Sequence, residues 1–510
     1  MLQHSVLRVY IVTDLGSPYP HVSPPECPLG EQLHQAASDE PDSPASETPI
    51  PGFLQAVWMA IKGTSVDYTE APIRHAIVLL AVPMVLEMVM ESVFAVVDIF
   101  FVSKLGPEQV AAVGLTESLM TLVYTVAMGL SIGVTAMIAR RAGEKDKDSA
   151  GHTAAQAVLL GGALAIVLGV AGAANAPGLL RMMGAGEDVI DLGSGYTQVL
   201  LGGNITVLLL FMNNAAFRGV GDAVIAMRML WLANAINIAL DATLIFGWGP
   251  FPEMGVQGAA VATVIGRGTA VVLQLIILIR GAGRLNVQAR HWRVDLPLMW
   301  RLVRLSGAAT FQTFIGMASW IGMVRIIAMF GSAALAGYTI AIRIVLFALL
   351  PAWGMSNAAA TMVGQGLGAG KPDRAEKSVW IAAFLNLIFL GSVGILFMVF
   401  AGPIVRVFTP DVETTANGIL ALRTVSAGFF FYAYGMVLIN SFNGAGDTWT
   451  PTWVNLLCFW VFQIPLAWTL SQTAGLGPWG VHLAVTLGFS SEALVAGLLF
   501  RRGKWKQKTV

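Results

Sequence analysis

The chain has 510 residues, of which 56% are hydrophobic and only 12% are charged. A soluble domain carries about 25% charged residues, so this composition argues against a soluble protein of several domains. The net charge is zero, and two cysteines exclude a framework of several disulfides.

The first 70 residues are predicted to form a disordered, acidic cytoplasmic tail. They carry nine acids and only two bases, so the rest of the chain is basic by the same amount. Proline, serine and acidic residues cluster here, as in residues 39–44, and such a stretch cannot bury enough apolar surface to fold. The apolar run at residues 6–12 is broken by Arg8 and has no cleavage site, so it is not a secretory signal.

From residue 71 onward, apolar runs recur that are long enough to cross a bilayer, which takes about 20 residues. They predict an all-α integral membrane protein with twelve transmembrane helices. The expected spans are residues 73–103, 116–139, 152–174, 192–216, 223–247, 255–279, 299–330, 335–362, 377–400, 417–441, 452–473 and 480–500.

The basic residues predict how the chain is oriented. The even-numbered connections and the C-terminal tail hold twenty Lys and Arg, whereas the odd-numbered connections hold three. Connections rich in Lys and Arg stay in the cytoplasm. We therefore expect both termini to be cytoplasmic in a multi-pass protein of the cell membrane.

An internal repeat relates the two halves of the chain. Residues 217–222 (FRGVGD) correspond to residues 442–447 (FNGAGD), an offset of 225 that other segments share. Each half therefore carries six spans, which is typical of transporters with parallel repeats. We expect an N-terminal lobe at 71–290, a C-terminal lobe at 291–502 and a basic tail at 503–510.

Two acids inside predicted spans break this symmetry. Asp98 lies in the first span and Asp241 in the fifth, and the residues 225 positions further on are Met323 and Leu466. A carboxylate at the centre of a bilayer costs about 2.5–3.5 kcal/mol, and such residues normally have a function.

Helical spacing adds partners to these acids. Asn237 and Asp241 are four residues apart, and Glu91 and Asp98 are seven apart, so each pair shares a helix face. Two neighbouring carboxylates raise the proton affinity of one of them, and a bound cation neutralises both. The sequence therefore predicts an ion-coupling site, against the alternative that the acids make structural or interfacial contacts.

Several segments together resemble the multidrug and toxic compound extrusion (MATE) family. They are residues 98–106 (DIFFVSKLG), 218–222 (RGVGD), 237–241 (NIALD), 255–263 (GVQGAAVAT) and 364–370 (GQGLGAG). The resemblance covers about residues 71–502, and the confinement of the acids to the N-terminal lobe is similar to the DNA-damage-inducible branch of the family. The resemblance implies a secondary active transporter that exchanges H⁺ or Na⁺ for bulky, often cationic, amphipathic compounds by alternating access.

The resemblance also implies roles for single residues. Asp98, Asn237 and Asp241 match the coupling site, and the resemblance implies that Thr263 lies nearby and would join these three residues if the site binds sodium. Glu91, Asn213 and Asn214 match positions that line the substrate cavity, together with Thr263, although an amide is usual where this chain has Glu91. Pro83 matches a kink in the first helix and is the predicted hinge. No cofactor is expected, and a proton and a sodium ion fit the oxygen ligands equally.

Three other functions remain open at this point. A lipid-linked oligosaccharide flippase of the same superfamily would use cationic cavity residues, for which Arg325 and Arg343 are candidates. An integral-membrane enzyme is disfavoured because no catalytic or Walker motif is present. A channel conflicts with the two-lobed repeat. The expected partners are small organic molecules and the bilayer, without nucleic acid, and the expected functional unit is a monomer.

Overall fold

The computed structural model describes residues 53–64, 66–102 and 104–510. Most of the predicted disordered tail, residues 1–52, lies outside this described part of the chain. Within it, every regular element is a helix and none is a strand, which confirms the predicted all-α fold.

The prediction of disorder is wrong for the last part of the tail. Helix α2 (Phe53–Lys62) is regular, and Tyr68 is buried. Leu54, Trp58 and Ile61 recur at helical spacing in α2. The acidic, proline-rich composition ends before this helix, so the predicted boundary at residue 70 was placed too late.

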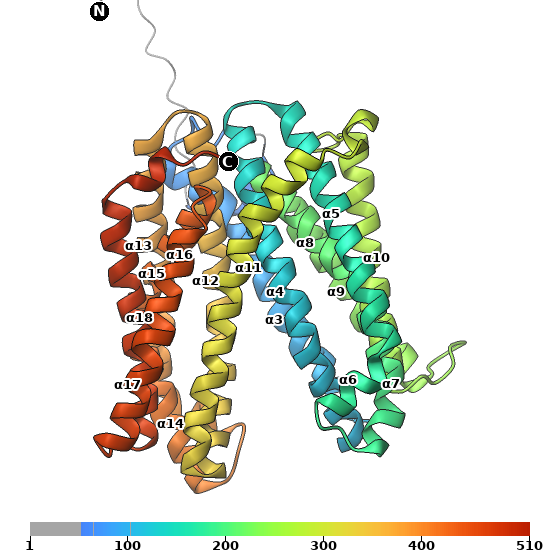
Figure 1. Ribbon diagram of the computed structural model, residues 1–510, viewed down its shortest axis with the longest axis vertical. Helices are drawn as coiled ribbons and strands as arrows, with labels where there is room; N and C mark the ends of the chain where they lie inside the picture. The colour runs from blue at the N-terminus through green and yellow to red at the C-terminus, as the bar shows by residue number, and fades with distance from the viewer. Residues whose placement is uncertain (1–52, 65, 103) are drawn as a thin grey trace, which may run out of the picture. The chain divides into compact units, whose positions relative to one another are not determined.

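The remaining helices form two lobes, drawn from blue to green and from yellow to red in Figure 1. The N-terminal lobe contains α3 (Ile73–Val102), α4 (Pro107–Gly143), α5 (Lys147–Ala174), α6 (Ala176–Met182), α7 (Glu187–Gly202), α8 (Asn204–Val220), α9 (Ala223–Phe246) and α10 (Val256–Arg280). The C-terminal lobe contains α11 (Leu296–Ile327), α12 (Ser332–Gly368), α13 (Pro372–Arg406), α14 (Val412–Ala427), α15 (Phe429–Gly444), α16 (Trp449–Asn455), α17 (Ile464–Trp468) and α18 (Pro478–Arg501). A π-helical segment at Leu456–Gln463 joins α16 to α17, and a second one at Thr469–Thr473 continues α17, so that Trp449–Thr473 form one continuous span.

The number of membrane spans agrees with the sequence. The described residues contain eleven helical segments long and apolar enough to cross a membrane, or twelve if the pair α14 and α15 counts as one span. These two helices meet at an angle of 55° around Gly428, whereas their counterparts α7 and α8 run on as one segment.

The internal repeat is visible in the helix boundaries. Helix α4 runs from Pro107 to Gly143, and α12 runs from Ser332 to Gly368, so both ends are offset by 225 residues. Helices α7 and α14 show the same offset at both ends. The two halves of the sequence thus build lobes of the same design.

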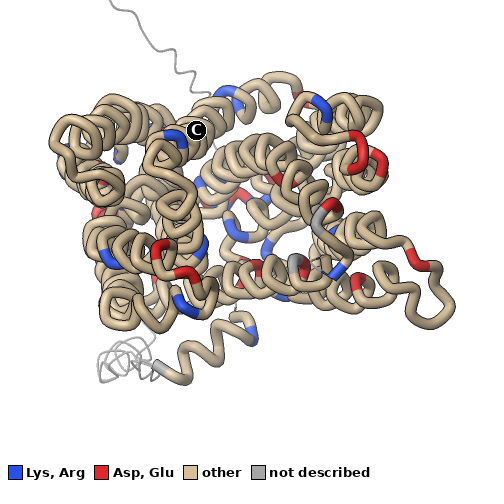
Figure 2. Tube along the Cα trace, turned by 90° about the horizontal axis from the view of Figure 1, so that it is seen from below, with Lys and Arg blue, Asp and Glu red and all other residues tan. Residues whose placement is uncertain are grey.

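The two lobes pack closely at one end and diverge at the other, where α6, α7 and α14 lie (Figure 1). Figure 2 shows the same lobes from below, with charged residues sparse along the tubes. The closed end carries the connections rich in Lys and Arg, and we call it the basic face. There Gln365 of α12 donates a hydrogen bond of 2.8 Å to the carbonyl of Gly219 in α8. Residues 76–84 of α3 also pack in the core of the C-terminal lobe, which differs from a simple division at residue 290.

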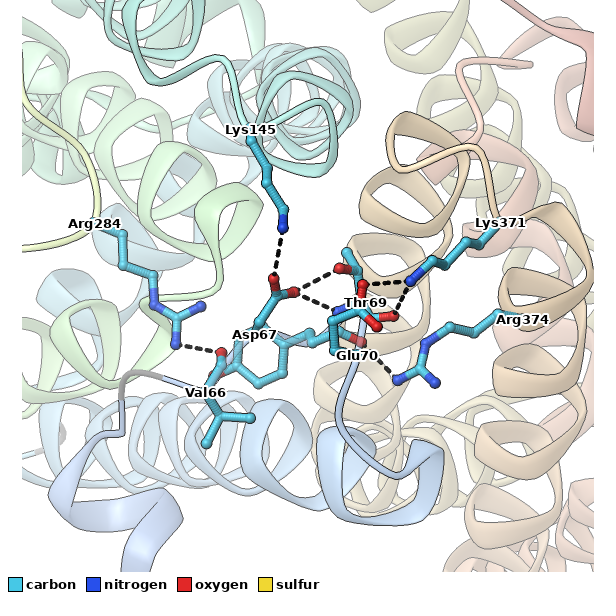
Figure 3. A network of polar contacts seen from close by, with 9 residues as sticks. Val66, Asp67, Thr69, Glu70, Lys145, Arg284, Lys371 and Arg374 are labelled. Carbon is cyan, nitrogen blue, oxygen red and sulfur yellow. Dashed lines mark hydrogen bonds and ion pairs between the residues drawn. The ribbon is translucent and has the colours of Figure 1, made fainter. Parts of the chain in front are cut away.

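A short segment before α3, residues 66–71, crosses the basic face, and we call it the strap (Figure 3). On the side of the N-terminal lobe, Asp67 forms an ion pair of 3.5 Å with Lys145. Arg284 donates to the carbonyl of Val66 at 2.8 Å, and its guanidinium lies over the ring of Tyr68. The strap is thus attached to the N-terminal lobe.

The same strap is attached to the C-terminal lobe. Lys371 forms an ion pair with Glu70. Arg374 donates to the carbonyls of Tyr68, at 2.9 Å, and of Ala71. Because its contacts reach both lobes, the strap stabilises the closed basic face.

We expect Arg374→Gln to loosen this closure. The variant loses hydrogen bonds from a charged donor to two carbonyls, which weakens closure by about 1 kcal/mol and raises the open population roughly fivefold. Spin labels at Lys147→Cys and Lys377→Cys, exposed positions in different lobes, report the separation in a background without Cys27 and Cys458. Arg141→Gln is the control, because the ion pair that Arg141 forms among the described residues is a local one, with Glu144 of the same lobe. An unchanged distance distribution in Arg374→Gln would contradict this role of the strap.

The strap should not respond to physiological pH. The hydrogen bond from Lys371 lowers the pKa of Glu70 below its ordinary value of 4.5. Burial acts to raise the pKa of Asp67, but hydrogen bonds from Thr69 and the Lys145 ammonium lower it below 3.8. Acids with depressed pKa values stabilise closure at neutral pH and lose this effect only as the pH falls below these values. The ion pairs of the strap should therefore persist from roughly pH 5.5 to pH 8, so a change in the spin-label distances over this range would have to come from groups outside the strap.

Candidate functional site

A cavity lies between the lobes and encloses about 1060 Å³ of empty space, part of it open to solvent. Its walls come from α3, α4, α8, α9 and α10 on one side and from α11, α12 and α15 on the other. Most of the lining is apolar, with Met88, Met128, Phe211 and Trp353 among its residues. Methionine and aromatic side chains adapt to ligands of different shape.

One buried polar network lines this cavity on the side of the N-terminal lobe. Arg218 forms an ion pair of 3.2 Å with Glu87 and donates to Ser131 at 3.2 Å. Asn214 donates to the same oxygen of Glu87 at 3.1 Å, and Gln274 donates to Asn214 at 2.6 Å. These contacts join α3, α4, α8 and α10, so the network fixes the polar wall of the cavity.

A second charged group lies further along α3. Arg267 of α10 donates to the hydroxyl of Tyr124 at 2.7 Å and forms a longer contact of 3.4 Å with Glu91. Its guanidinium also lies over the rings of Tyr124 and Phe94. The side chain of Arg267 is 8% exposed, whereas that of Glu91 is 33% exposed. The arginine is therefore fixed, and the glutamate reaches into the cavity.

The predicted coupling residues lie outside the residues that line this cavity. Asp241 of α9 is completely buried, and neither of its carboxylate oxygens has a hydrogen-bond partner among the described residues. The half-buried Asp98 lies near enough for the two charges to interact. Asn237 donates its amide to the hydroxyl of Thr263 at 3.0 Å, which leaves its own oxygen without a partner. The structure thus brings all four predicted residues into one region of the N-terminal lobe.

This region offers oxygen atoms to a small cation. Two carboxylates, one amide oxygen and one hydroxyl are the donors that a hard cation prefers, and the carboxylates also accept a proton. The described residues contain no group of three His, Cys, Asp or Glu side chains that could hold a metal ion. Buried acceptors without donors are costly, so this region is suited to receive a cation from outside the protein.

The other predicted residues are divided between cavity and core. Glu91 and Asn214 line the cavity, whereas Asn213 is completely buried beside it, and its side-chain atoms have no partner among the described residues. Arg325 and Arg343 are exposed and are not among the residues that line this cavity, although Arg343 of α12 lies near enough to Glu117 of α4 for their charges to interact.

Sequence reasoning missed the two arginines that do line the cavity. Arg218 stands at the end of a predicted span, where a basic residue normally belongs to a cytoplasmic connection, yet it is buried in α8. Arg267 stands in the middle of a span, which was the available signal, but long basic side chains often reach an interface instead. Whether Arg267 faces the cavity or reaches a membrane interface depends on how α10 is rotated about its own axis, which the sequence does not specify.

The fold and the cavity define a class of protein. Two lobes of the same design, a cavity between them and a buried acidic region in one lobe are features of a multi-pass transporter of the plasma membrane. The model of the MatE family matches the chain twice, at residues 83–243 and 308–469, which repeats the offset of 225 at its first position. The chain belongs to the MATE family of multidrug efflux transporters, as the sequence predicted.

Individual relatives cover most of the chain. A probable multidrug resistance protein NorM of Thermotoga maritima is 28% identical over 450 residues, 86% of this chain and 95% of that protein. A protein named FAD transporter from Shewanella oneidensis is 27% identical over 67% of this chain and 76% of its own length. A solved structure, described as the outward-facing conformation of a multidrug resistance MATE family transporter, has a TM-score of 0.81 at 25% identity. It matches 88% of this chain and 99% of that one.

Proposed function

We propose that this transporter exports bulky amphipathic organic compounds, often cationic, in exchange for H⁺ or Na⁺. The observation that carries the proposal is the carboxylate of Asp241, which is buried beside Asp98 and has no donor among the described residues. A site of this kind binds a cation or a proton in one state and releases it in the other. No cofactor takes part, and a single chain is the proposed functional unit.

Coupling requires that the acidic region and the cavity communicate. Helix α3 carries Asp98 near one end and Glu91 in the cavity. Helix α9, which carries Asp241, is attached to α3 by hydrogen bonds from Trp231 to the carbonyl of Leu86, at 3.1 Å, and from Asn234 to that of Met90, at 3.4 Å. In this proposal, neutralising the acids changes how α3 packs on α9, and this movement alters the cavity.

The proposal also assigns a direction. Basic connections stay in the cytoplasm, so the basic face, where the two lobes pack closely, is the cytoplasmic end of the protein. The cavity is then closed toward the cytoplasm and accessible from outside the cell. Export then requires a second state in which the strap contacts are broken and the basic face opens. Similarity to a transporter described as outward-facing supports this assignment.

Pro83 is the proposed hinge of α3. It lies inside the helix, where proline removes a hydrogen bond and favours bending. We expect Pro83→Ala to straighten α3 and to lower the rate of transport about tenfold, a barrier change of about 1.4 kcal/mol. Binding of the substrate should be unaffected. Normal transport rates in proteoliposomes containing Pro83→Ala would show that the kink has only a packing role.

The proposal is tested by reconstituting the purified protein in liposomes loaded with a fluorescent organic cation. A pH gradient and a sodium gradient are imposed separately. We expect one of the two gradients to drive movement of the dye, which identifies the coupling ion. If ions flow without the dye, the protein is a channel, and if neither gradient moves the dye, the export proposal fails.

A lipid-linked oligosaccharide flippase is the second candidate function. The observation that favours it is the pair Arg218 and Arg267 in the cavity wall, because guanidinium groups bind phosphates well. The name of the Shewanella relative, an FAD transporter, likewise supports cargo other than simple cations. Translocation of a fluorescent pyrophosphate-linked lipid, with no movement of the organic cation, would favour this candidate.

A further inference from the structure

The charges in the wall of the cavity are balanced. Glu87 and Glu91 are the acidic residues of the lining, and Arg218 and Arg267 are its basic residues. A wall with acids alone attracts a cationic compound and repels an acidic one. In this cavity, by contrast, an acidic group can find a positive partner.

The two arginines are not equivalent. Arg218 is held by an ion pair with Glu87 and a hydrogen bond to Ser131, and Glu87 also accepts from Asn214. This network is closed on itself and suits a structural role. Arg267 has a short bond only to Tyr124, while its contact with Glu91 is 3.4 Å long. Both guanidinium groups are buried, but Arg267 has the longer contact with its glutamate, 3.4 Å against 3.2 Å for Arg218, so its pairing with an acid is the easier one to replace.

We propose that Arg267, together with the hydroxyl of Tyr124, binds a carboxylate of the transported compound. A guanidinium binds a carboxylate through two parallel hydrogen bonds, which is stronger than a single long contact. The side chain of Glu91 is 33% exposed, against 8% for Arg267, so Glu91 has more room than Arg267 to change its conformation when a ligand binds. The inference rests on the proposed function and narrows its substrate class to amphiphiles that carry an acidic group.

The cavity wall also offers acidic residues that could pair with a positive group on the same compound. One oxygen of Glu91 and one of Glu87 are buried without a hydrogen-bond partner among the described residues. Both residues belong to the lining of a cavity whose wall is mainly apolar in surface area. A compound with a carboxylate, an ammonium or iminium group and an apolar body would pair with Arg267, with these oxygens and with the apolar wall at the same time.

The test compares two dyes that differ only in this group. One is a cationic xanthene dye with a free carboxylate, and the other is its methyl ester. Binding to the full chain in lipid nanodiscs is measured by fluorescence anisotropy, without any ion gradient. We expect Arg267→Gln to weaken binding of the free acid about tenfold. The ester should bind as well as before or more tightly, because Glu91 loses its positive neighbour.

The control is Arg325→Gln, which removes an exposed arginine outside the cavity and should change neither affinity. Equal weakening of both dyes by Arg267→Gln, or no weakening of the free acid, would overturn the proposal. If Arg267→Gln does not fold, Tyr124→Phe takes its place, with about a threefold loss expected for the free acid alone. Because binding needs no gradient, these outcomes are distinct from a failure of ion-coupled export.

Discussion

Asp241→Asn is expected to abolish gradient-driven transport without destabilising the protein. The buried carboxylate has no hydrogen-bond donor among the described residues, so its ionised form costs free energy in the folded state. Asparagine has almost the same shape but can neither bind a proton nor attract a cation. Removing the charge therefore removes the coupling step and leaves the packing of α9 intact.

The measurements are dye transport in proteoliposomes and thermal unfolding in detergent. Transport by Asp241→Asn should fall to the level of protein-free liposomes, while the unfolding temperature stays equal to that of the wild type or rises. Asp188→Asn, an exposed acid in the first turn of α7, is the matched control and should transport normally. Normal transport by Asp241→Asn would place the coupling site elsewhere, whereas loss of folding would show a structural role.

Much of the fold could be predicted from the sequence because a bilayer imposes simple rules. Apolar length marks each span, and basic connections mark one face. The repeat was recognisable because segments such as residues 217–222 and 442–447 occupy equivalent turns in the two lobes. Asp98 and Asp241 were identifiable as unusual because charges inside spans are rare.

What could not be predicted depends on contacts between distant parts of the chain. Glu70 pairs with Lys371, about 300 positions away, and neither residue has a local signal for that contact. Arg267 looks the same in the sequence whether it faces lipid or a cavity. Its partners Tyr124 and Glu91 lie on two other helices, so its role follows only from how the helices are rotated.

Gly354→Ala is expected to destabilise the closed state of the basic face. Gly354 of α12 packs directly on α3 next to Pro83, and a Cβ atom built there would lie 2.6 Å from the carbonyl oxygen of Met84. That atom belongs to the backbone, so the helices must separate to make room. Overpacking of this kind typically costs about 1–3 kcal/mol.

The matched control is expected to change the stability of the protein in the opposite direction. Gly316 of α11 is also helical, but a Cβ atom there would have no neighbour within 4 Å. Gly316→Ala should therefore stabilise the protein, because alanine is better than glycine in a helix by up to about 1 kcal/mol. Thermal unfolding should show a lower unfolding temperature for Gly354→Ala and a higher one for Gly316→Ala. Spin labels at Lys147→Cys and Lys377→Cys should show a wider basic face only in Gly354→Ala. If both variants gain stability and the distances do not change, the contact between α3 and α12 is too loose to control opening.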